Sequence, residues 1–568
     1  MTDSDHAHRA PVVPQRTPSG RTTVTVSLPD DIRTVPVGTT PYEVLPSAVD
    51  DHPVVAAIVD GVIMPLDTPL LSDVSVKALT TAEREGQRIY RRSAALMLLE
   101  AAAEIDPDRT FSLGSSLSTH QWIDVTGPDG EPLERLAPRL EARMRAMVAA
   151  DIDIRHEWWA AQEAIDWFRD RGWTSPALLL HMSREFAVRL VTCGSLRYLG
   201  LSALASRAGR IGQFSVRAVD GRLLLIAGGD ERTSAEVASR AYADVLHQHA
   251  RWLASLGVNS VGEFNEKCVR GHVADTIRVA EGFHEKRFTH IADTIASRSG
   301  VRIVCVAGPS SSGKTTFIKR LSVQLQVNGL DPVNVSLDDY YKDRERCPRD
   351  ASGDYDFEAL EALDLALLGD QMARLLRGET VKLARFSFQS GRSIPDGGRE
   401  VRLREGGLLV LEGIHGLNPS LLGPGVEAAQ VYRIFIQPLA SLAFDPLSRV
   451  NPTDLRLIRR IVRDRHTRNA TAAESIARWP AVRRGEHAHI FPHISRADVV
   501  FDTSLIYELS VLKVYAERYL LEVPRSDPAF ATAFRLRELI DRFVAIYPDH
   551  VPPTSILREF IGASSFEY

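Results

Sequence analysis

The chain has 568 residues, of which 44% are hydrophobic and 25% are charged, and its formal net charge is −5. This length exceeds what one hydrophobic core supports, so we expect about two to four domains. The balanced charge argues against a globally basic nucleic-acid-binding protein, and the lack of an apolar run of about 18 residues argues against a membrane span. Four widely spaced cysteines suggest neither a disulfide framework nor a cysteine-based zinc site. These features predict a cytoplasmic enzyme.

The first 80 residues predict a tail followed by a small β-rich module. Residues 1–20 are polar, rich in Pro and His, and lack an apolar signal core, so we expect a disordered tail. Thr23–Leu28 alternates polar and apolar residues, as a half-buried strand does. Val54–Val62 contains an Asp-Gly turn and predicts a hairpin, and Val74–Leu79 predicts a closing strand. Residues 21–80 are therefore expected to form one domain.

From Thr81 to about residue 290 the sequence predicts helices mixed with strands. Ile89, Leu96 and Leu99 recur at helical spacing in a segment rich in Ala, Leu, Arg and Glu. Further helices are expected at Leu133–Ala149, His156–Arg171 and Ser234–Leu256, strands at Gln213–Ala218 and Arg222–Ile226, and helical structure over Glu266–Ser299. Residues 81–290 are expected to form a second, α+β domain.

From Val301 onward strand and helix patterns alternate, which predicts an α/β domain over residues 291–568 with a parallel sheet and helices on both faces. The expected strands are Ile303–Ala307, Val333–Ser336, Leu408–Leu411, Val431–Ile436 and Asp498–Phe501. The expected helices cover Thr316–Gln326 and follow Glu358, Thr453 and Tyr507, with Leu360, Leu363 and Leu367 on one face of the second.

A phosphate-binding motif follows the first of these strands. The residues are Gly308, Pro309, Ser310, Ser311, Ser312, Gly313, Lys314, Thr315 and Thr316, which fit the pattern G-x-x-x-x-G-K-[ST] between a strand and a helix. Backbone N–H groups of such a loop cradle phosphates, Lys314 neutralises the β- and γ-phosphates, and Thr315 offers its hydroxyl to Mg²⁺. The motif predicts that the chain binds a nucleoside triphosphate.

Acidic residues follow the next two strands. Asp338 and Asp339 come directly after the second strand, and Glu412 ends the third. In a doubly wound sheet, ligands lie outside the carboxyl ends of the strands, so these acids are expected to face the phosphates. An acid there can take the proton of an attacking hydroxyl or position a metal ion. The alternative is a pair of solvated acidic turns.

An arginine stripe lies in the helix expected after Thr453. Its members are Arg456, Arg459, Arg460, Arg463 and Arg468. Phosphoryl transfer spreads negative charge over the equatorial oxygens, and a closing arginine lid can stabilise that charge while excluding water. The alternative is a solvated, salt-bridged helix face. Behind a phosphate-binding loop and two strand-end acids, we favour the lid.

Together these segments resemble the uridine kinase and phosphoribulokinase family of P-loop kinases over roughly residues 300–520. The segments that carry the resemblance are Gly308–Thr316, Leu337–Tyr341, Tyr355–Leu360, Leu411–Gly416 and Arg459–Asp464. The resemblance implies a P-loop kinase domain that uses ATP and Mg²⁺, with Asp338 activating the acceptor hydroxyl and with Arg463 and Arg468 as lid arginines.

The N-terminal part carries a second resemblance. Residues 21–80 resemble the TGS domain, the small β-grasp module of threonyl-tRNA synthetases, and residues 85–230 are similar to their editing-type domain. That domain implies a metal held by paired histidines on a helix and by a later Cys/His pair. Here Arg92 and Leu96 stand at the histidine positions, and Cys193 has no histidine beside it. We therefore predict no zinc and no editing activity in this region.

The acceptor site is expected to contain Asp338, Tyr341, Phe386, Phe388 and Arg392. Uridine kinases usually carry a histidine and an arginine that clasp the pyrimidine and ribose. The matching stretch Arg385–Arg392 keeps the aromatics and the arginine but lacks the histidine. A nucleoside can still stack on the rings, whereas discrimination between bases is expected to weaken.

The sequence favours a kinase that transfers the γ-phosphoryl group of ATP to a hydroxyl of a small molecule, most simply a nucleoside such as uridine. One alternative is a nucleotide-binding regulator whose TGS-like region contacts RNA or the ribosome, although the charge gives no support for RNA binding and no N-K-x-D guanine motif occurs. Another is a kinase for a sugar phosphate or other metabolite. The oligomeric state stays open, with a homo-oligomer as one alternative.

Overall fold

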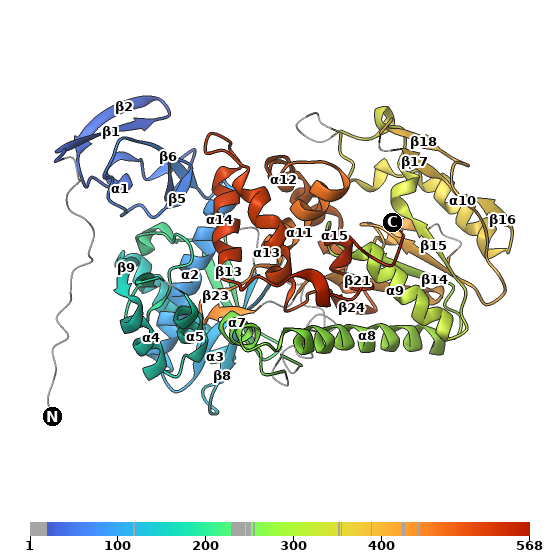
Figure 1. The fold of residues 1–568 in the computed structure, drawn as a ribbon, viewed down its shortest axis with the longest axis horizontal. Coiled ribbons are helices and arrows are strands. Elements are labelled where there is room, and N and C mark those ends of the chain that lie inside the picture. Colours follow the sequence, from blue (N-terminus) through green and yellow to red (C-terminus); the bar gives the residue numbers. More distant parts are fainter. Residues whose placement is uncertain are drawn as a thin grey trace.

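The computed structural model describes most of the chain and places its N-terminal and C-terminal sheets at opposite ends of the long axis (Figure 1). The described residues are 20–117, 120–183, 185–228, 245, 252–253, 256–349, 353, 355–387, 389–422, 426–439 and 442–567. Nearly all of the predicted tail, most of the helix predicted at Ser234–Leu256, and Phe388 lie outside them. No helix in the described part has the length and apolarity needed to cross a membrane.

The N-terminal sheet has the strand order β2-β1-β6-β4-β3, and β5 pairs with β4. Its elements are β1 (Thr23–Leu28), β2 (Asp31–Pro36), α1 (Pro41–Val44), β3 (Ala48–Val49), β4 (His52–Val59), β5 (Val62–Met64) and β6 (Val74–Thr80). The first and last strands pair in parallel, which gives the β-grasp arrangement. The alternation in β1 buries Val24 and Val26, as the sequence predicts, and the β4–β5 hairpin is confirmed.

The middle region contains two antiparallel sheets, in the orders β12-β13-β8-β7 and β11-β10-β9. Its strands are β7 (Thr110–Leu117), β8 (His120–Thr126), β9 (Arg155–Ala160), β10 (Ala187–Thr192), β11 (Tyr198–Leu199), β12 (Phe214–Val219) and β13 (Arg222–Ala227). Its helices are α2 (Arg84–Ile105), α3 (Leu133–Ala149), α4 (Ala161–Asp170) and α5 (Thr174–Met182). The helix predicted at His156–Arg171 is wrong in its first part, because residues 155–160 pair with β10 and the helix begins at Ala161.

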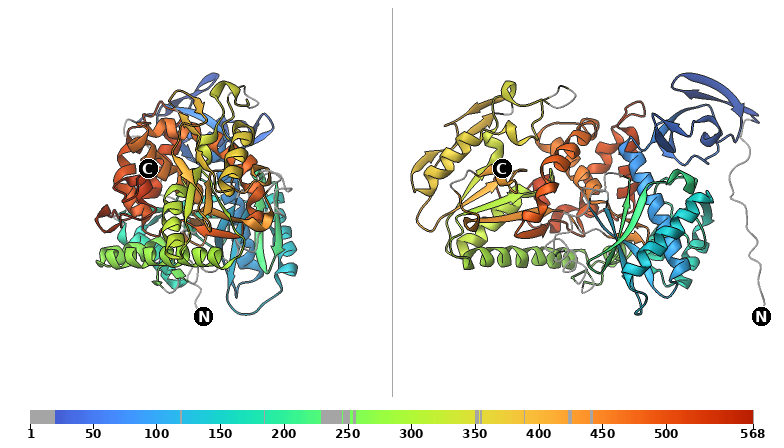
Figure 2. Two further views of the ribbon diagram at one scale, coloured as in Figure 1. Left: turned by 90° about the vertical axis from the view of Figure 1, so that its right-hand side faces the viewer. Right: turned by 180° about the vertical axis from the view of Figure 1, so that it is seen from behind.

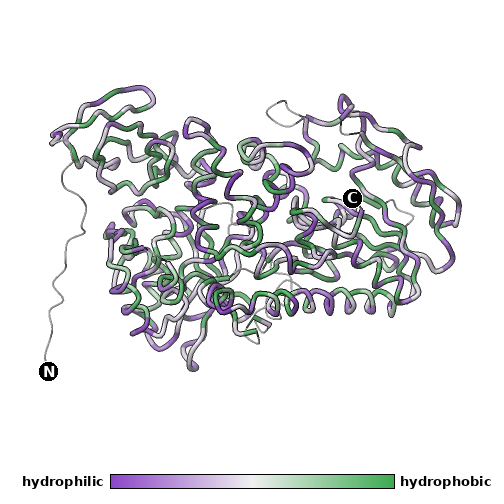
Figure 3. The backbone as a smooth tube through the Cα atoms, in the orientation of Figure 1, coloured by the Kyte–Doolittle hydropathy of each residue, from purple (hydrophilic) through white to green (hydrophobic). Residues whose placement is uncertain are grey.

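The C-terminal sheet is parallel throughout, in the order β15-β20-β14-β21-β24, and confirms the predicted fold class. Its strands are β14 (Ile303–Ala307), β15 (Pro332–Ser336), β20 (Leu408–Glu412), β21 (Val431–Gln437) and β24 (Val499–Asp502). Successive residues of β14 point to opposite faces, so Val304 and Val306 join one core while Ile303 and Cys305 join another. The strands are accordingly hydrophobic along their lengths (Figure 3).

Helices cover both faces of this sheet. The helices of this half of the chain are α7 (Val261–Val269), α8 (Val273–Ser297), α9 (Lys314–Val327), α10 (Leu365–Leu376), α11 (Pro452–Thr467), α12 (Ala472–His489), α13 (Glu508–Leu521), α14 (Phe530–Asp541) and α15 (Arg558–Ile561), of which α7 and α14 pack on other elements. The helix predicted directly after Glu358 begins later, because Leu360–Ala362 forms a 3₁₀ turn and Asp364 caps the helix at Leu365. Short two-stranded sheets complete the domain: β16 (Thr380–Lys382) with β19 (Glu400–Arg402), β17 (Arg385–Ser387) with β18 (Arg392–Ile394), and β22 (Ala443–Asp445) with β23 (Ser448–Arg449).

The long helix α8 runs along one edge of the molecule towards the C-terminal sheet (Figures 1 and 2). Phe288 on this helix packs against Phe317 of α9 and Phe501 of β24, with ring centroids 5.0 and 4.8 Å away. The predicted division between residues 290 and 291 falls inside α8. The domain boundaries stay predictions.

A buried carboxylate joins the middle region to the C-terminal domain. Asp454 of α11 accepts hydrogen bonds from Arg535 of α14 at 2.9 Å and from Arg88 of α2, and it lies 3.6 Å from Arg84. Burial alone would raise the pKa of Asp454, but Arg535 and Arg88 outweigh it and hold that pKa well below its ordinary value. This carboxylate therefore ties three helices from distant parts of the chain.

We expect Asp454→Asn to destabilise the protein by about 3 kcal/mol or more, because three guanidinium groups lose their shared counter-charge in a buried setting. Thermal unfolding at pH 7 measures the change as a lower Tm. Asp275→Asn is the matched control, since its pair with Arg278 is 71% exposed on both sides. Equal melting temperatures for the two variants would contradict the role of Asp454.

Candidate active site

The phosphate-binding loop lies between β14 and α9, at the centre of the parallel sheet. The loop needs glycine at its first position, because a Cβ on Gly308 would lie 2.2 Å from the carbonyl oxygen of Ile436 in the neighbouring strand. It also needs glycine before the helix, because Gly313 has φ +92° and a Cβ there would lie 2.5 Å from Ile556. Neighbouring strands and the C-terminal segment thus fix the shape of the loop.

Lys314 is the first residue of α9, and its side chain folds back across the loop. Its Nζ donates to the carbonyl oxygens of Gly308 at 2.9 Å and Pro309 at 3.2 Å. Loop N–H groups, the helix N-terminus and this ammonium group thus converge on one place. Such a set of donors fits the phosphates of a nucleotide.

Thr315 and Glu412 are brought together by strand pairing. Glu412 ends β20 directly beside Val306 of β14, and its Oε1 accepts a hydrogen bond of 3.2 Å from the Thr315 hydroxyl. Burial raises the pKa of Glu412 to about 7, with Lys314 opposing the shift. A hydroxyl and a carboxylate side by side are the hard oxygen ligands that suit Mg²⁺ next to bound phosphates, so the two residues fit the predicted metal.

Asp338 lies in the 3₁₀ turn (Leu337–Tyr340) that follows β15. The Asp338 side chain reaches solvent, but protein atoms are packed closely around it. The resulting loss of hydration raises the pKa of Asp338, while Lys314, Arg468 and Arg463 act to lower it. The other three predicted catalytic residues therefore lie close enough to Asp338 for their charges to affect its pKa.

The arginine stripe divides into two groups with different contacts, and Arg460 lies between them. Arg460 is buried, donates from Nη1 to the Ser310 hydroxyl at 3.0 Å and pairs with Asp464 at 3.2 Å. Arg456 and Arg459 are fully buried and hold the back of the phosphate-binding loop. Arg456 Nε donates to the carbonyl oxygen of Ser310 at 2.9 Å, and Arg459 Nη1 reaches those of Ser311 and Ser312 at 3.5 and 3.4 Å. The prediction that the stripe as a whole forms a lid is therefore wrong for these two residues, because they position the loop from inside the core.

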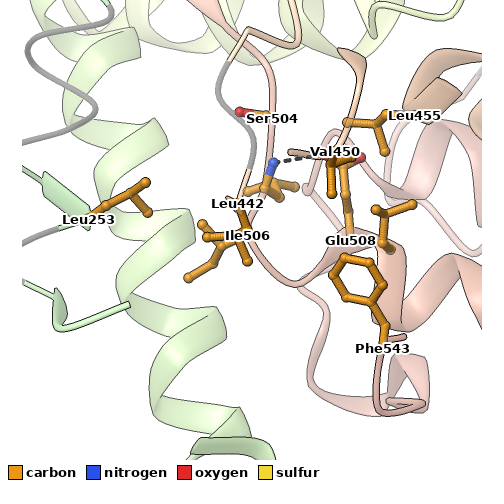
Figure 4. Close-up of a pocket in the computed structure, with 10 residues that line it drawn as sticks. Leu253, Leu442, Val450, Leu455, Ser504, Ile506, Glu508 and Phe543 are labelled. Carbon is orange, nitrogen blue, oxygen red and sulfur yellow. Dashed lines mark hydrogen bonds between the residues drawn. The ribbon is translucent and has the colours of Figure 1, made fainter. Parts of the chain in front are cut away.

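These two buried arginines pair with different carboxylates, one of which is shared with Arg483. Arg456 pairs with Glu486 of α12, whose Oε1 also accepts from the backbone N–H of Ser310 at 3.3 Å. Arg459 Nε donates to Glu508 Oε2 at 2.6 Å, and Glu508 Oε1 accepts from the Leu505 N–H at 2.9 Å beside a small apolar cavity of about 30 Å³ (Figure 4). That cavity has room for about one water molecule, so it is too small to hold a substrate.

The last two arginines of the stripe lie nearer to Asp338. Arg463 donates to Asp464 Oδ1 at 2.7 Å, and Arg468 lies 3.6 Å from the same oxygen with 60% of its side chain exposed. Both guanidinium groups act on the pKa of Asp338.

The predicted acceptor residues surround the β17–β18 hairpin. Phe386 is buried against Tyr341, with ring centroids 5.6 Å apart, and its N–H lies 3.4 Å from an oxygen of Asp339. Arg392 is exposed on β18, and Phe388 lies outside the described residues. Phe357 extends the aromatic cluster 6.3 Å from Tyr341 and is 37% exposed, so it offers a ring face that the sequence analysis missed.

Glu559 is a second residue that the sequence analysis missed. Its Oε2 accepts hydrogen bonds of 3.0 Å from both the N–H and the hydroxyl of Thr316, across 243 residues of sequence. Its charge also helps to raise the pKa of Glu412. The C-terminal helix α15 therefore places a carboxylate on donors of the phosphate-binding loop.

Arg92 and Cys193 stand where the resemblance implies metal ligands, and the structure shows their surroundings. Arg92 donates to the hydroxyls of Ser202 and, at 2.9 Å, Ser448. Cys193 is buried, which raises the pKa of its thiol, and the nearby Glu100 accepts from backbone N–H groups of residues 195 and 196. Among the residues that the structure describes, no group of three or more His, Cys, Asp or Glu side chains is arranged to hold a metal ion. The absence of zinc stays a prediction.

Comparison with known proteins finds a family match in the C-terminal part of the chain. Residues 303–506 match the phosphoribulokinase/uridine kinase family, so the C-terminal part of the chain is a domain of that family. A solved structure of a possible uridine kinase from Bacillus stearothermophilus is similar at 21% identity with a TM-score of 0.25, covering 38% of this chain and 98% of that one.

The N-terminal part is similar to threonine–tRNA ligases. The relative from Desulfosudis oleivorans is 30% identical over 175 residues, which are 30% of this chain and 27% of the ligase. The relative from Haloarcula marismortui is 27% identical over 199 residues, which are 34% of this chain and 30% of the ligase. The match thus spans less than a third of these ligases.

We expect Glu559→Gln to strengthen binding of MgATP by several-fold. The carboxylate occupies two donors of Thr316 and adds negative charge where phosphates are expected, so its neutralisation removes a competitor. Calorimetric titration with a nonhydrolysable ATP analogue measures the dissociation constant. Glu567→Gln, in the same C-terminal segment but exposed, should leave it unchanged. Weaker binding by Glu559→Gln would show that the contact supports the loop.

Proposed function

We propose that the C-terminal domain is an ATP- and Mg²⁺-dependent kinase that phosphorylates a hydroxyl of a small molecule, most simply a nucleoside such as uridine. The observation that carries the proposal is that Lys314 and Asp338 follow the carboxyl ends of β14 and β15, with Arg463 and Arg468 close enough to act on the pKa of Asp338. This edge is where such sheets bind ligands, and the charges match those of a phosphoryl-transfer site.

The proposed reaction divides the work among these residues. Loop N–H groups and Lys314 bind the β- and γ-phosphates, and Thr315 and Glu412 would hold Mg²⁺, which supplies charge neutralisation when bound. Asp338 orients the acceptor hydroxyl and takes its proton as the acceptor oxygen bonds to the γ-phosphorus. The bond from that phosphorus to the bridging oxygen breaks and ADP leaves. Arg463 and Arg468 stabilise the charge on the equatorial oxygens.

The acceptor is proposed to lie against the aromatic cluster of Tyr341, Phe357 and Phe386. Phe357 is partly exposed and can pack on a nucleobase or sugar, with the buried rings of Tyr341 and Phe386 beside it, while the missing histidine removes one hydrogen bond to the base. Purified protein incubated with labelled ATP and a panel of nucleosides tests this directly. We expect transfer to at least one nucleoside, and transfer to none would remove the nucleoside assignment.

A sugar phosphate or another phosphorylated metabolite is the second candidate acceptor. The hairpin that carries Arg392 also carries Arg385, and Arg344 lies beside it with its N–H donating to the carbonyl oxygen of Gly391 at 2.9 Å. Arginines around the acceptor region suit a substrate that already bears a phosphate. The same panel, extended to sugar phosphates, decides between the two classes. A cytoplasmic location is part of the proposal in either case.

We expect Asp338→Asn to lower kcat by about 100-fold or more while the affinity for ATP stays close to that of the wild type, because the amide cannot accept the proton. Steady-state kinetics and a nucleotide titration separate the two effects. Asp339→Asn is the neighbouring control and should keep most of the activity. An unchanged kcat in Asp338→Asn would remove this residue from the mechanism.

Lys314→Ala is expected to weaken nucleotide binding and turnover together, since the ammonium group contacts the phosphates both before and during transfer. Lys319→Ala, farther along the same helix, is the matched control. Titration with ATP and measurement of kcat give both quantities. Full turnover in Lys314→Ala would show that the loop does not hold the reacting phosphates.

A further inference from the structure

A second cavity, separate from the phosphate-binding loop, lies between the middle region and the C-terminal domain. Its volume is about 800 Å³, and it is lined by α2, β7, β8, the β22–β23 hairpin, α12 and α14. Cavities that bind small molecules have volumes of roughly 300–1,000 Å³. No residue of the loop Gly308–Thr316 is among its described lining residues, so an occupant here would not touch the proposed ATP site.

The lining is strongly basic. Nine of the described lining residues are arginines, and Glu538 is the one acid among them. Asp454, just behind the wall, is shared by Arg84, Arg88 and Arg535, and Arg535 also pairs with Glu85 at 2.9 Å, so two carboxylates serve three guanidinium groups. Other wall arginines pair with acids outside the lining, as Arg542 does with Glu185 at 3.4 Å. The positive charge of the nine lining arginines nevertheless exceeds the negative charge of the one acid in the lining.

These arginines differ in how far the protein already uses their hydrogen-bond donors. Arg92, on α2, donates to the hydroxyls of Ser202 and Ser448. The buried Nε–H of Arg88 has no hydrogen-bond partner among the described residues. Arg484, on α12, is exposed. Guanidinium donors of this kind bind phosphate oxygens in forked pairs.

The pKa values of two residues in the cavity wall reflect the positive charge around them. Burial lowers the pKa of Arg91 to about 10, and Arg483, Arg88 and Arg84 push it in the same direction. Burial also lowers the pKa of His487 to about 4, with Arg483 adding to the shift. A bound anion would relieve these like-charge contacts.

The cavity also has an apolar part. Leu201, Leu225, Phe444 and Leu447 contribute to its wall beside the arginines. A simple inorganic anion would leave this surface uncovered, whereas a molecule with a phosphate at one end and an organic body would cover both parts.

We propose that this arginine-lined cavity binds a phosphorylated small molecule of about nucleotide size. Its phosphate contacts the arginines of α2 and α12, and its organic part packs against the leucines and Phe444. The site is distinct from the proposed kinase site and does not depend on it.

The test uses the full chain with its phosphate-binding loop filled by a nonhydrolysable ATP analogue and Mg²⁺. Adenosine 5′-monophosphate is then titrated by calorimetry, with adenosine as the probe that lacks the phosphate. We expect binding of the monophosphate, much weaker binding of adenosine, and lower affinity at higher salt. Absence of monophosphate binding at millimolar concentration would overturn the proposal.

Charge-matched variants locate the binding. Arg92→Gln combined with Arg484→Gln should weaken monophosphate binding by about tenfold or more, since each removes a donor to phosphate. Arg139→Gln combined with Arg278→Gln makes the same charge change at side chains that are 54% and 71% exposed elsewhere. Arg484→Gln alone, at an exposed position, should weaken binding even if the double variant fails to fold. Equal affinity in the wild type and both cavity variants would place the monophosphate elsewhere and overturn the proposal.

Discussion

The structure depends most on buried arginines that hold the phosphate-binding loop from behind. Arg456 and Arg459 bond to loop carbonyl oxygens, and Glu486 and Glu508 balance their charges. Burying such ions costs several kcal/mol each unless every charge is paired and hydrogen-bonded, so the four residues form an interdependent unit. The same helix carries Asp454, which ties it to α2 and α14. One helix thus connects the loop to the N-terminal half of the chain.

The parallel sheet places the remaining groups. The strand order β15-β20-β14 sets the turn with Asp338, the strand end with Glu412 and the phosphate-binding loop next to one another. Because all three leave the sheet at its carboxyl edge, residues more than 70 positions apart in sequence share one site. The charged groups there influence one another: burial raises the pKa of both Asp338 and Glu412, and Lys314 acts to lower both.

The sequence was sufficient for features that depend on local pattern. Continuous apolar runs predict all five strands of the parallel sheet to within about two residues, and the loop motif and strand-end acids predict much of the candidate site. Features that depend on distant pairing were missed. Residues 155–160 become a strand only because β10 lies beside them. The contact between Glu559 and Thr316 crosses 243 residues, so no local pattern contains it. The spacing of the arginines also did not reveal which of them are buried.

The N-terminal part of the chain is similar to threonine–tRNA ligases, and a basic cavity lies between the middle region and the C-terminal domain. The central claim, phosphoryl transfer to a small-molecule hydroxyl, is tested most directly by measuring ADP and phosphorylated acceptor in the same reaction. The account predicts that ADP forms only with an acceptor and in a ratio near one to the phosphorylated product. ADP formed without any phosphorylated acceptor would contradict it and indicate a nucleotide-hydrolysing regulator.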